Sequence, residues 1–422
     1  MKKTFAIILA VASFAACTRE DLSIIIEEPE VQTYTMTVEA NKGEKQDDDP
    51  ATRALSLSGG STLNATWTAG DAVEVWTSDG TTTKYGTLTA ETSGASTKLK
   101  GTLSTLPGNG QSLLLKYLSP AYATQDGTLT GSATSIDRVC DYATATVTAT
   151  VVGSNVTATD ANFVNRQAIV KFTLKNKDGG AALSVDKLFV TAGGTTCEVT
   201  PSGATNVLYV AVPAIASGRV TLTALSGSTY YDYLKTGVTL AQSQYYAINA
   251  SLTEVKVKNS ATTASLGRVL DANGKMYASV ESAANAGTTA LAVIVQRDGY
   301  TYWAIAISEE SSTMTWNAAS NAIDNKTPAV YGAPWRFPNN DHWTSMCAAN
   351  GGNGYNYTGL NALITKAGGS PLRTDWFYWT ATTNGSTVSE VSFNKDGSLF
   401  FKDGMEKDGT CYVRAYLFFN GI

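Results

Sequence analysis

Residues 31–40 read Val-Gln-Thr-Tyr-Thr-Met-Thr-Val-Glu-Ala, and from Thr33 onward polar and apolar side chains alternate. The apolar positions are Tyr34, Met36, Val38 and Ala40, and the polar positions are Thr33, Thr35, Thr37 and Glu39. Successive side chains of a β-strand point to opposite faces, so this alternation predicts a strand with one face buried.

The strand is followed by a polar segment, residues 41–52, that contains Gly43, three consecutive aspartates and Pro50. A segment of this composition buries too little apolar surface to order itself. We therefore predict a flexible, protease-accessible linker that ends just before Arg53.

Short strands separated by turns fill the next two regions, 53–152 and 153–256. Thr, Val and Tyr, which favour strands, are frequent there, and no helical period is evident. The predicted strands cover residues 72–76, 84–89, 96–103 and 112–118, and then 168–174, 185–191, 207–212, 219–225 and 245–252. This spacing of strands and turns predicts a mostly β chain with two tandem β-sandwich domains.

The pattern changes in residues 257–422, where helices and strands are mixed. A hairpin is predicted over 291–307, and helices over 316–323, 341–349 and 358–366. Four strands follow at 377–382, 388–394, 398–402 and 410–419, with Asn-Gly or Asp-Gly turns between them. The region is therefore predicted to be a compact α+β domain that ends on a long strand.

The first residues have the pattern of a secretory signal peptide, assigned to residues 1–16. Lys2 and Lys3 precede a short apolar run, and Ala15-Ala16 precede Cys17. The run is too short to span a bilayer. The segment resembles a bacterial lipobox, which implies that Cys17 is lipidated and that residues 17–52 form a membrane-anchored N-terminus. The alternative is a secreted protein with an ordinary signal peptide.

The charge and the histidine content exclude several classes of function. A net charge of -5 gives no basic surface for nucleic acid. The single histidine, His342, leaves few metal sites and few Ser-His or Cys-His catalytic schemes. His342 itself is best explained as part of a helix start. We therefore expect no metal, no cofactor and no catalytic residues, and we expect Cys140 and Cys197 to be unpaired.

Two segments resemble the bacteroidete-type (Mfa-like) fimbrillin pilins. Thr52-Arg53-Ala54, followed by Trp67, Gly70-Asp71 and Trp76, is similar to the opening of that family. Residues 168–174, 210–213 and 240–250 are similar to its second sandwich. The resemblance covers roughly residues 17–255, and it implies two transthyretin-like sandwiches.

The resemblance also implies a mode of assembly. In that family a trypsin-like protease cuts after an arginine, which corresponds here to a cut between Arg53 and Ala54. The cut would release the strand that contains Tyr34, Met36, Val38 and Ala40. The groove left behind would accept a strand from another pilin subunit. The alternative for Arg53 is a solvated linker charge.

The last domain resembles a C-type-lectin-like domain. The residues that carry the resemblance are Trp335-Arg336-Phe337-Pro338 with Trp343, Tyr378-Trp379-Thr380-Ala381-Thr382, and Tyr412-Val413-Arg414. The Glu-Pro-Asn and Trp-Asn-Asp signatures of calcium-dependent sugar binding are absent. Many lectin-like domains tie a helix to their last strand, which implies a disulfide between Cys347 and Cys411. The alternative is two buried thiols.

Aromatic residues of this domain are the candidate ligand-binding residues, because sugars stack on aromatic faces. If residues 376–379 enter a strand, Phe377 and Trp379 should be core, and Trp376 and Tyr378 exposed. Tyr355 and Tyr357 lie in a loop rich in Gly and Asn. Core packing is the alternative for all of these side chains.

Together these features predict a lipoprotein of the outer membrane and cell surface that acts in a fimbrium. We expect a tip or accessory pilin that accepts a donor strand and presents a lectin-like domain to a host or bacterial surface glycan or protein. The tip position follows from the last strand, which is needed to close its own domain. The alternatives are a monomeric surface glycan-binding lipoprotein and a carboxylate-based glycan-active enzyme.

Overall fold

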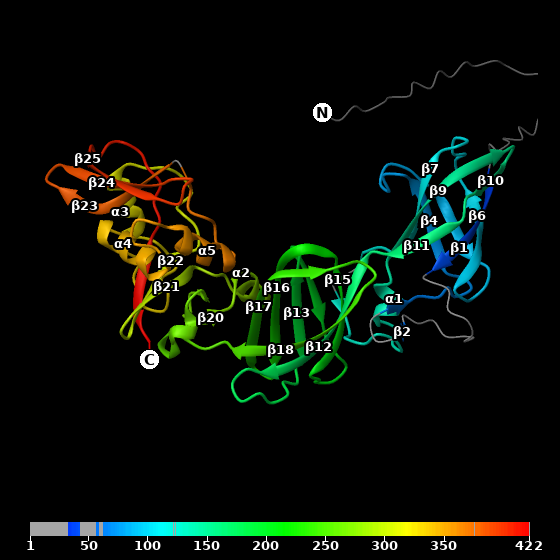
Figure 1. Cartoon of the computed structure of the whole chain (residues 1–422), viewed down its shortest axis with the longest axis horizontal. Helices are drawn as coiled ribbons and strands as arrows, with labels where there is room; N and C mark the ends of the chain where they lie inside the picture. The colour runs from blue at the N-terminus through cyan, green and yellow to red at the C-terminus, as the bar shows by residue number, and fades with distance from the viewer. Residues whose placement is uncertain are drawn as a thin grey trace, which may run out of the picture.

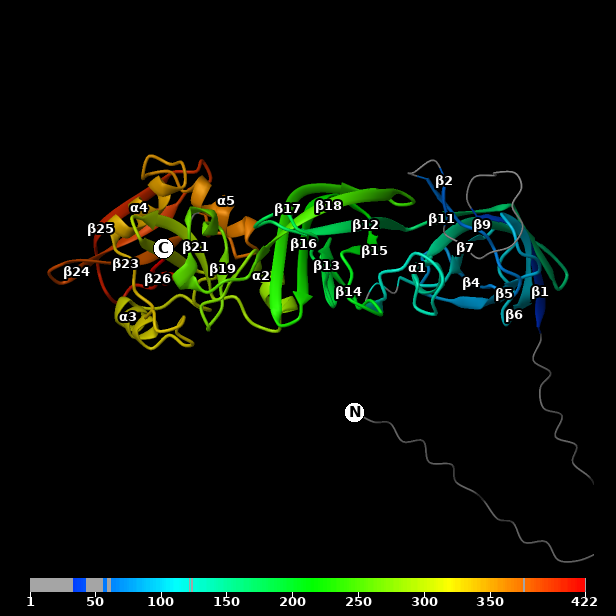
Figure 2. The same cartoon turned by 90° about the horizontal axis from the view of Figure 1, so that it is seen from below.

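The computed structural model describes residues 33–42, 56–58, 62–120, 122, 124–374 and 376–421. The signal peptide, Cys17, Arg53 and Ala54 lie outside these residues. The described chain is mostly β, as predicted, and its three domains follow one another in a row (Figures 1 and 2). The first and third domains lie at opposite ends of the second.

The first domain is one closed sheet. Its strands are β1 (Tyr34–Lys42), β4 (Ala72–Thr77), β5 (Lys84–Ala90), β6 (Ser96–Leu103), β7 (Ser112–Tyr117), β9 (Ala143–Val152), β10 (Asn155–Ala158) and β11 (Ala161–Asn165). They lie in the order β10-β1-β11-β9-β7-β4-β5-β6, and a further pairing of β1 with β6 closes the sheet on itself. A separate hairpin joins β2 (Ser56–Ser58) to β3 (Thr62–Asn64).

The closed sheet surrounds an apolar core centred on Trp67, which is 1% exposed. The Trp67 ring makes edge contacts with Tyr117 and Phe163, with ring centroids 5.5 and 5.0 Å apart. Tyr117 belongs to β7 and Phe163 to β11, so the Trp67 ring links these two strands inside the closed sheet. A buried tryptophan with two aromatic neighbours contributes strongly to core stability.

The second domain also has a sheet of eight strands, in the order β15-β12-β18-β17-β16-β13-β14-β8. Its elements are β8 (Thr124–Gln125), α1 (Ile136–Val139), β12 (Gln167–Asn176), β13 (Lys187–Ala192), β14 (Thr195–Val199), β15 (Val207–Pro213), β16 (Ile215–Ser226), β17 (Thr229–Leu240) and β18 (Tyr245–Glu254). The first and last of the long strands, β12 and β18, pair in parallel.

The predicted boundary between the first two domains, at residues 152 and 153, is too early. β10 and β11 follow that point, yet they pair with β1 and β9 of the first sheet. In the other direction, β8 precedes β9 but pairs with β14 of the second sheet. The first sheet therefore extends to Asn165, because its closing strand β1 needs β10 and β11 as partners.

The third domain combines two sheets with helices. A five-stranded sheet has the order β20-β19-β21-β22-β26, and a three-stranded sheet has the order β23-β24-β25. The strands are β19 (Val269–Leu270), β20 (Met276–Tyr277), β21 (Ala292–Asp298), β22 (Thr301–Ala306), β23 (Phe377–Asn384), β24 (Thr387–Phe393), β25 (Leu399–Met405) and β26 (Tyr416–Asn420). The helices are α2 (Val280–Asn285), α3 (Trp316–Asp324), α4 (Asn340–Ala349) and α5 (Thr358–Lys366), with short 3-10 turns η1 (Lys258–Ser260) and η2 (Thr263–Ser265).

The three predicted helices are confirmed as α3, α4 and α5, and the hairpin is confirmed as β21 and β22. The Asp408-Gly409 turn favours a hairpin between the last two predicted strands, and this expectation is wrong. β26 pairs with β22 instead of β25, over Thr301↔Asn420 to Ile305↔Tyr416. Its side chains Leu417 and Phe419 are buried, which explains why the strand enters the larger sheet.

His342 belongs to the start of α4, as expected. The Asn339 side chain accepts a hydrogen bond from the His342 N–H at 2.8 Å, and the Asn339 N–H donates to His342 Nδ1 at 3.1 Å. His342 Nε2 lies 3.1 Å from the Tyr416 hydroxyl, and burial lowers the pKa of His342. These reciprocal hydrogen bonds hold the His342 ring in place, and its role is to cap the start of α4.

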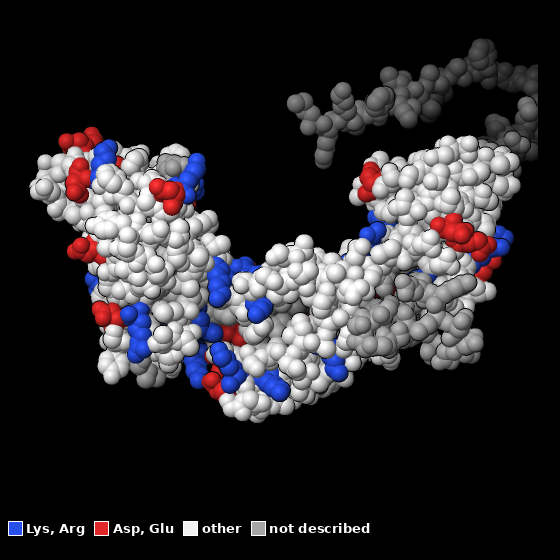
Figure 3. Space-filling model, in the orientation of Figure 1, with Lys and Arg blue, Asp and Glu red and all other residues white. Residues whose placement is uncertain are grey.

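Two ion pairs, one buried and one partly exposed, join the second domain to the third. Asp232 of β17 forms an ion pair with Arg268 at 2.6 Å, and its other oxygen accepts the N–H of Ala278 at 2.6 Å. Arg219 of β16 pairs with Glu281 of α2 and also donates to the Thr365 carbonyl at the end of α5. Lys and Arg side chains gather on the surface at this junction (Figure 3).

Among the described residues, no helix is long and apolar enough to cross a membrane.

Candidate functional site

The first strand, β1, is the element on which the predicted assembly depends. Its side chains alternate as the sequence predicts: Met36, Val38 and Ala40 are 0%, 1% and 1% exposed, whereas Thr35 and Glu39 are exposed. Met36, Val38 and Ala40 belong to the core cluster that also contains Trp67 and Leu99, and the half-buried Tyr34 packs against it. The predicted inward face is thus confirmed.

β1 has strand partners along both of its edges. On one edge it pairs antiparallel with β6, from Tyr34↔Leu103 to Asn41↔Ser96. On the other edge it pairs in parallel with β10 and then with β11. On the outer surface, Glu39 lies opposite Lys98, and the two form an exposed ion pair at 3.4 Å. β1 is therefore an integral strand that closes the sheet.

Lys42 ends β1 inside the domain. The residue is 2% exposed, and its ammonium lies 3.0 Å from Asp141 Oδ2. The same nitrogen lies 3.3 Å from the centroid of the Tyr117 ring and 4.7 Å from that of Trp67. A lysine charge is rarely buried unless it is paired, and here a carboxylate and two aromatic faces surround it.

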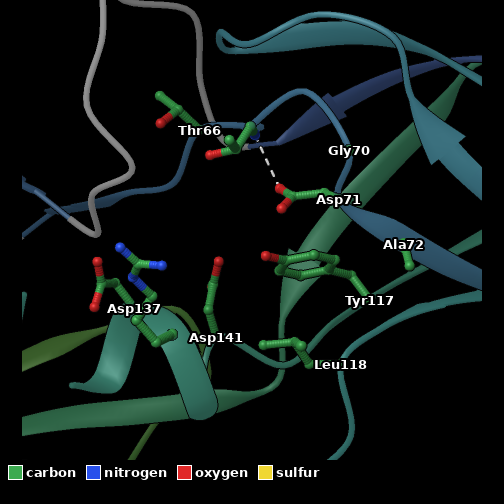
Figure 4. Close-up of a pocket in the computed structure, with 10 residues that line it drawn as sticks. Thr66, Gly70, Asp71, Ala72, Tyr117, Leu118, Asp137 and Asp141 are labelled. Atoms are coloured by element: carbon green, nitrogen blue, oxygen red, sulfur yellow. Dashed lines mark hydrogen bonds between the residues drawn. The ribbon is translucent and has the colours of Figure 1, made fainter. Parts of the chain in front are cut away.

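Asp141 provides the counter-charge from the segment between α1 and β9. Asp141 is 4% exposed, and this burial raises the pKa of its carboxyl. The positive charge of Lys42 opposes the rise, because it favours the ionised carboxylate. Asp71 and Asp137 raise the pKa further, because their negative charges lie nearby. The three carboxylates and Tyr117 line a cavity of about 220 Å³ (Figure 4). Arg138 lines the cavity as well, and Asp141 and Tyr117 are also the partners of Lys42, so this acidic pocket lies beside the end of β1.

Sequence reasoning missed Lys42 and Asp141. Residues 41 and 42 were assigned to the linker, because the segment 41–52 is polar and contains Gly43, three aspartates and Pro50. Lys42 nevertheless continues the alternation of Tyr34, Met36, Val38 and Ala40, and this period was a signal that could have placed it inward. For Asp141, no pattern in the neighbouring sequence predicts that its side chain is buried.

The predicted ligand-binding aromatics are divided between surface and core. Trp376 and Tyr355 are 53% and 57% exposed. Tyr378 is 0% exposed, and its hydroxyl accepts a hydrogen bond from the Arg373 N–H at 3.0 Å. Tyr357 is 4% exposed, and its hydroxyl donates to the Asn394 carbonyl at 2.9 Å. The predicted exposure of Tyr378 is therefore wrong, and both buried tyrosines are core residues.

Phe377 takes the exposed position that was predicted for Tyr378. Phe377, Ser392 and Phe400 lie opposite one another across β23, β24 and β25, and Phe377 and Phe400 are 40% and 58% exposed. Trp376 precedes this row, and its ring makes an edge contact with Tyr412 at 5.6 Å. We call Trp376, Phe377 and Phe400 the aromatic strip. It lies on the three-stranded sheet of the third domain.

The predicted disulfide between Cys347 and Cys411 is not formed, and both residues are free thiols. Cys347 packs on the α4 side with Trp343 and Met346, whereas Cys411 belongs to the other core cluster and donates to Glu390 at 3.3 Å. Cys140 and Cys197 form no disulfide with another described cysteine, and burial raises the pKa of Cys140, Cys197, Cys347 and Cys411 to about 12. Within the described residues, no group of His, Cys, Asp and Glu has the arrangement of a metal site.

No protein-family model matches the sequence, and no curated protein is similar to it. Several solved structures resemble the chain. A fimbrial protein from Bacteroides ovatus is 10% identical over 85% of this chain and 96% of that one, with a TM-score of 0.24. A fimbrial assembly protein from Parabacteroides distasonis is 14% identical over 52% of this chain and 91% of that one, with a TM-score of 0.27. A shaft pilin from Lactobacillus rhamnosus is 8% identical over 54% of this chain and 99% of that one, with a TM-score of 0.23. At these values the likenesses assign no family.

Proposed function

We propose that the chain is a cell-surface fimbrial subunit of the tip or accessory type, anchored to the outer membrane through Cys17 until it is cut after Arg53. Its first domain exchanges β1 for a strand of another pilin subunit, and its third domain binds a surface glycan or protein without catalysis. The observation that carries the proposal is that β1 closes the first sheet although it is joined to the rest of that domain only through the segment that contains Arg53.

Loss of β1 would leave the first domain with a defect that only another strand can repair. The partner edges on β6 and on β10 and β11 would lose their backbone hydrogen bonds. The positions of Met36 and Val38 would leave apolar holes, and burying such a side chain contributes about 1.5–3 kcal/mol. An extended strand with the same alternation satisfies both requirements, which is the principle of strand complementation.

The tip position is supported by β26. This strand contributes Leu417 and Phe419 to the third domain's core and pairs with β22 along its length. Donating it to another subunit would therefore disrupt the third domain. That domain lies at the far end of the molecule from β1, so a bound neighbour at the first domain would leave it exposed (Figures 1 and 2).

The adhesive role rests on the aromatic strip. Phe377 and Phe400 lie on β23 and β25, the two outer strands of the three-stranded sheet, and Trp376 directly precedes β23. All three rings are exposed to solvent, and exposed rings of this kind can stack against sugars. The same strip favours the second candidate, a glycan-binding surface lipoprotein that stays a monomer. The two candidates share the third domain and differ in what happens to β1.

Replacement of β1 after cleavage tests the proposal. The full chain is cut by mild trypsin treatment until Ala54 is the new N-terminus, and is then incubated with an excess of an amidated peptide of residues 31–43. We expect native mass spectrometry to show the peptide in place of the released fragment, in a one-to-one complex. A Lys45→Gln/Arg53→Gln variant, which lacks both trypsin sites of the linker, should bind no peptide. Failure of the cleaved chain to take up the peptide would contradict the proposal and favour the monomeric glycan-binding protein.

A further inference from the structure

We propose that the acidic pocket at the end of β1 selects the incoming strand by its charge: the donor must present a lysine or arginine at the position of Lys42. The inference rests on the proposed strand exchange and specifies its partner as an extended segment with apolar residues at every second position followed by a cation.

The position of the cation follows from the register of β1. Tyr34, Met36, Val38, Ala40 and Lys42 occupy the inward positions, so the cation is the fifth inward residue. Any strand that takes the place of Met36 and Val38 in the same register brings its own residue to the Lys42 position. A shift by one residue would turn the apolar side chains outward, so the register is strongly fixed.

The chemistry of the pocket is specific for a cation. Asp141 Oδ2 lies 3.0 Å from the Lys42 nitrogen, and Asp141 Oδ1 is buried without a hydrogen-bond partner among the described residues. Tyr117 and Trp67 present their ring faces to the same nitrogen. If Lys42 left with β1, Asp141 would remain buried without its counter-charge.

An empty pocket or a neutral donor residue is therefore unfavourable. A buried ion pair that loses one partner leaves an uncompensated charge, and this penalty is much larger than the loss of an exposed pair. Asp71 and Asp137 add negative charge to the pocket walls, and Arg138, which also lines the pocket, is exposed to solvent at its rim, so that the carboxylates outnumber the cation three to one. The pocket therefore disfavours an apolar or acidic residue at the Lys42 position of the donor. The rest of the groove that β1 leaves accepts apolar residues at the positions of Met36, Val38 and Ala40.

The test compares two donor peptides on two acceptor proteins. The amidated 31–43 peptide and its Lys42→Met form are added to the cleaved full chain and to its Asp141→Asn variant, and the fraction of complex is measured by native mass spectrometry. On the unsubstituted protein we expect the Met peptide to bind at least about tenfold more weakly than the Lys peptide. On the Asp141→Asn protein this preference should fall to below about threefold. A Glu39→Gln peptide, changed in the exposed pair with Lys98, should bind as the Lys peptide does.

The outcomes separate the two proposals. If no peptide replaces β1 in the unsubstituted protein, strand exchange itself fails. If both peptides replace β1 equally well, exchange stands and selection by charge is wrong. If the Asp141→Asn protein does not fold, the two peptides are still compared on the unsubstituted protein, where equal binding would overturn the inference.

Discussion

Replacing Val38 with aspartate should unfold the first domain while the second and third domains stay folded. Val38 is 1% exposed and lies opposite Leu99, which is 0% exposed, in the middle of β1. An unpaired carboxylate at this position would cost at least about 4 kcal/mol, a large part of the stability of a typical domain. Hydrogen–deuterium exchange should show rapid exchange in peptides from β4 to β7 and unchanged protection in peptides from β12 to β18.

The matched control is Thr35→Asp, on the outer face of the same strand. Thr35 is exposed, so the added charge stays in water and should change stability by about 0.5 kcal/mol or less. Equal protection of β4 to β7 in the Val38→Asp variant and the parent protein would show that β1 is dispensable for the first domain.

Replacing Arg268 with methionine should weaken the junction between the second and third domains by about 3–5 kcal/mol. Asp232 has a side chain that is 0% exposed, and Arg268 is its ion-pair partner at 2.6 Å. The variant leaves a carboxylate buried between the domains with only the Ala278 N–H to stabilise it. Urea unfolding should show an earlier transition, with exchange protection lost first around β17 and α2.

The pH dependence of this variant has a definite sign. Burial raises the pKa of Asp232 above its usual 3.8, so at pH values between the two pKa values the folded protein binds more protons than the unfolded chain. The contribution of this group to stability therefore falls as pH rises and recovers as pH falls toward 4. The difference in free energy of unfolding between Arg268→Met and the parent protein should therefore shrink as pH falls toward 4. A deficit that grows on acidification would contradict the buried-carboxylate explanation.

Much of the fold could be predicted from local patterns. Alternation placed the inward face of β1, and the strand 96–103 was predicted with the bounds that β6 has. Two of the three helices of the third domain have a local end signal, the cap at Asn339 before α4 and the Gly368-Gly369 stop after α5. These features depend on neighbouring residues only, so the sequence contains them directly.

The remaining features depend on contacts between distant segments. The closure of the first sheet needs β1, β6 and β10 together, and no local pattern indicates that β10 belongs to the first domain. The aromatic run at residues 376–379 has no polar residue to set its phase, so Tyr378 and Phe377 were assigned to the wrong faces. Lys42 was placed in solvent because its partner, Asp141, lies 99 residues away in sequence.

The central claim is that a strand from another molecule can occupy the place of β1 in the same register. A disulfide between a donor peptide and the acceptor tests it most directly, because side chains directly opposite on neighbouring strands lie within about 5.5 Å between Cβ atoms. The donor is the 31–43 peptide with Glu39→Cys, and the acceptor is the cleaved chain with Lys98→Cys, the residue opposite Glu39. The four described native cysteines are buried thiols and should not compete.

We expect this pair to cross-link under mild oxidation. An acceptor with Lys100→Cys, which lies opposite Thr37, should cross-link poorly with the same peptide. No cross-link at residue 98, or equal cross-linking at residues 98 and 100, would contradict the claim that the first domain accepts a strand in place of β1.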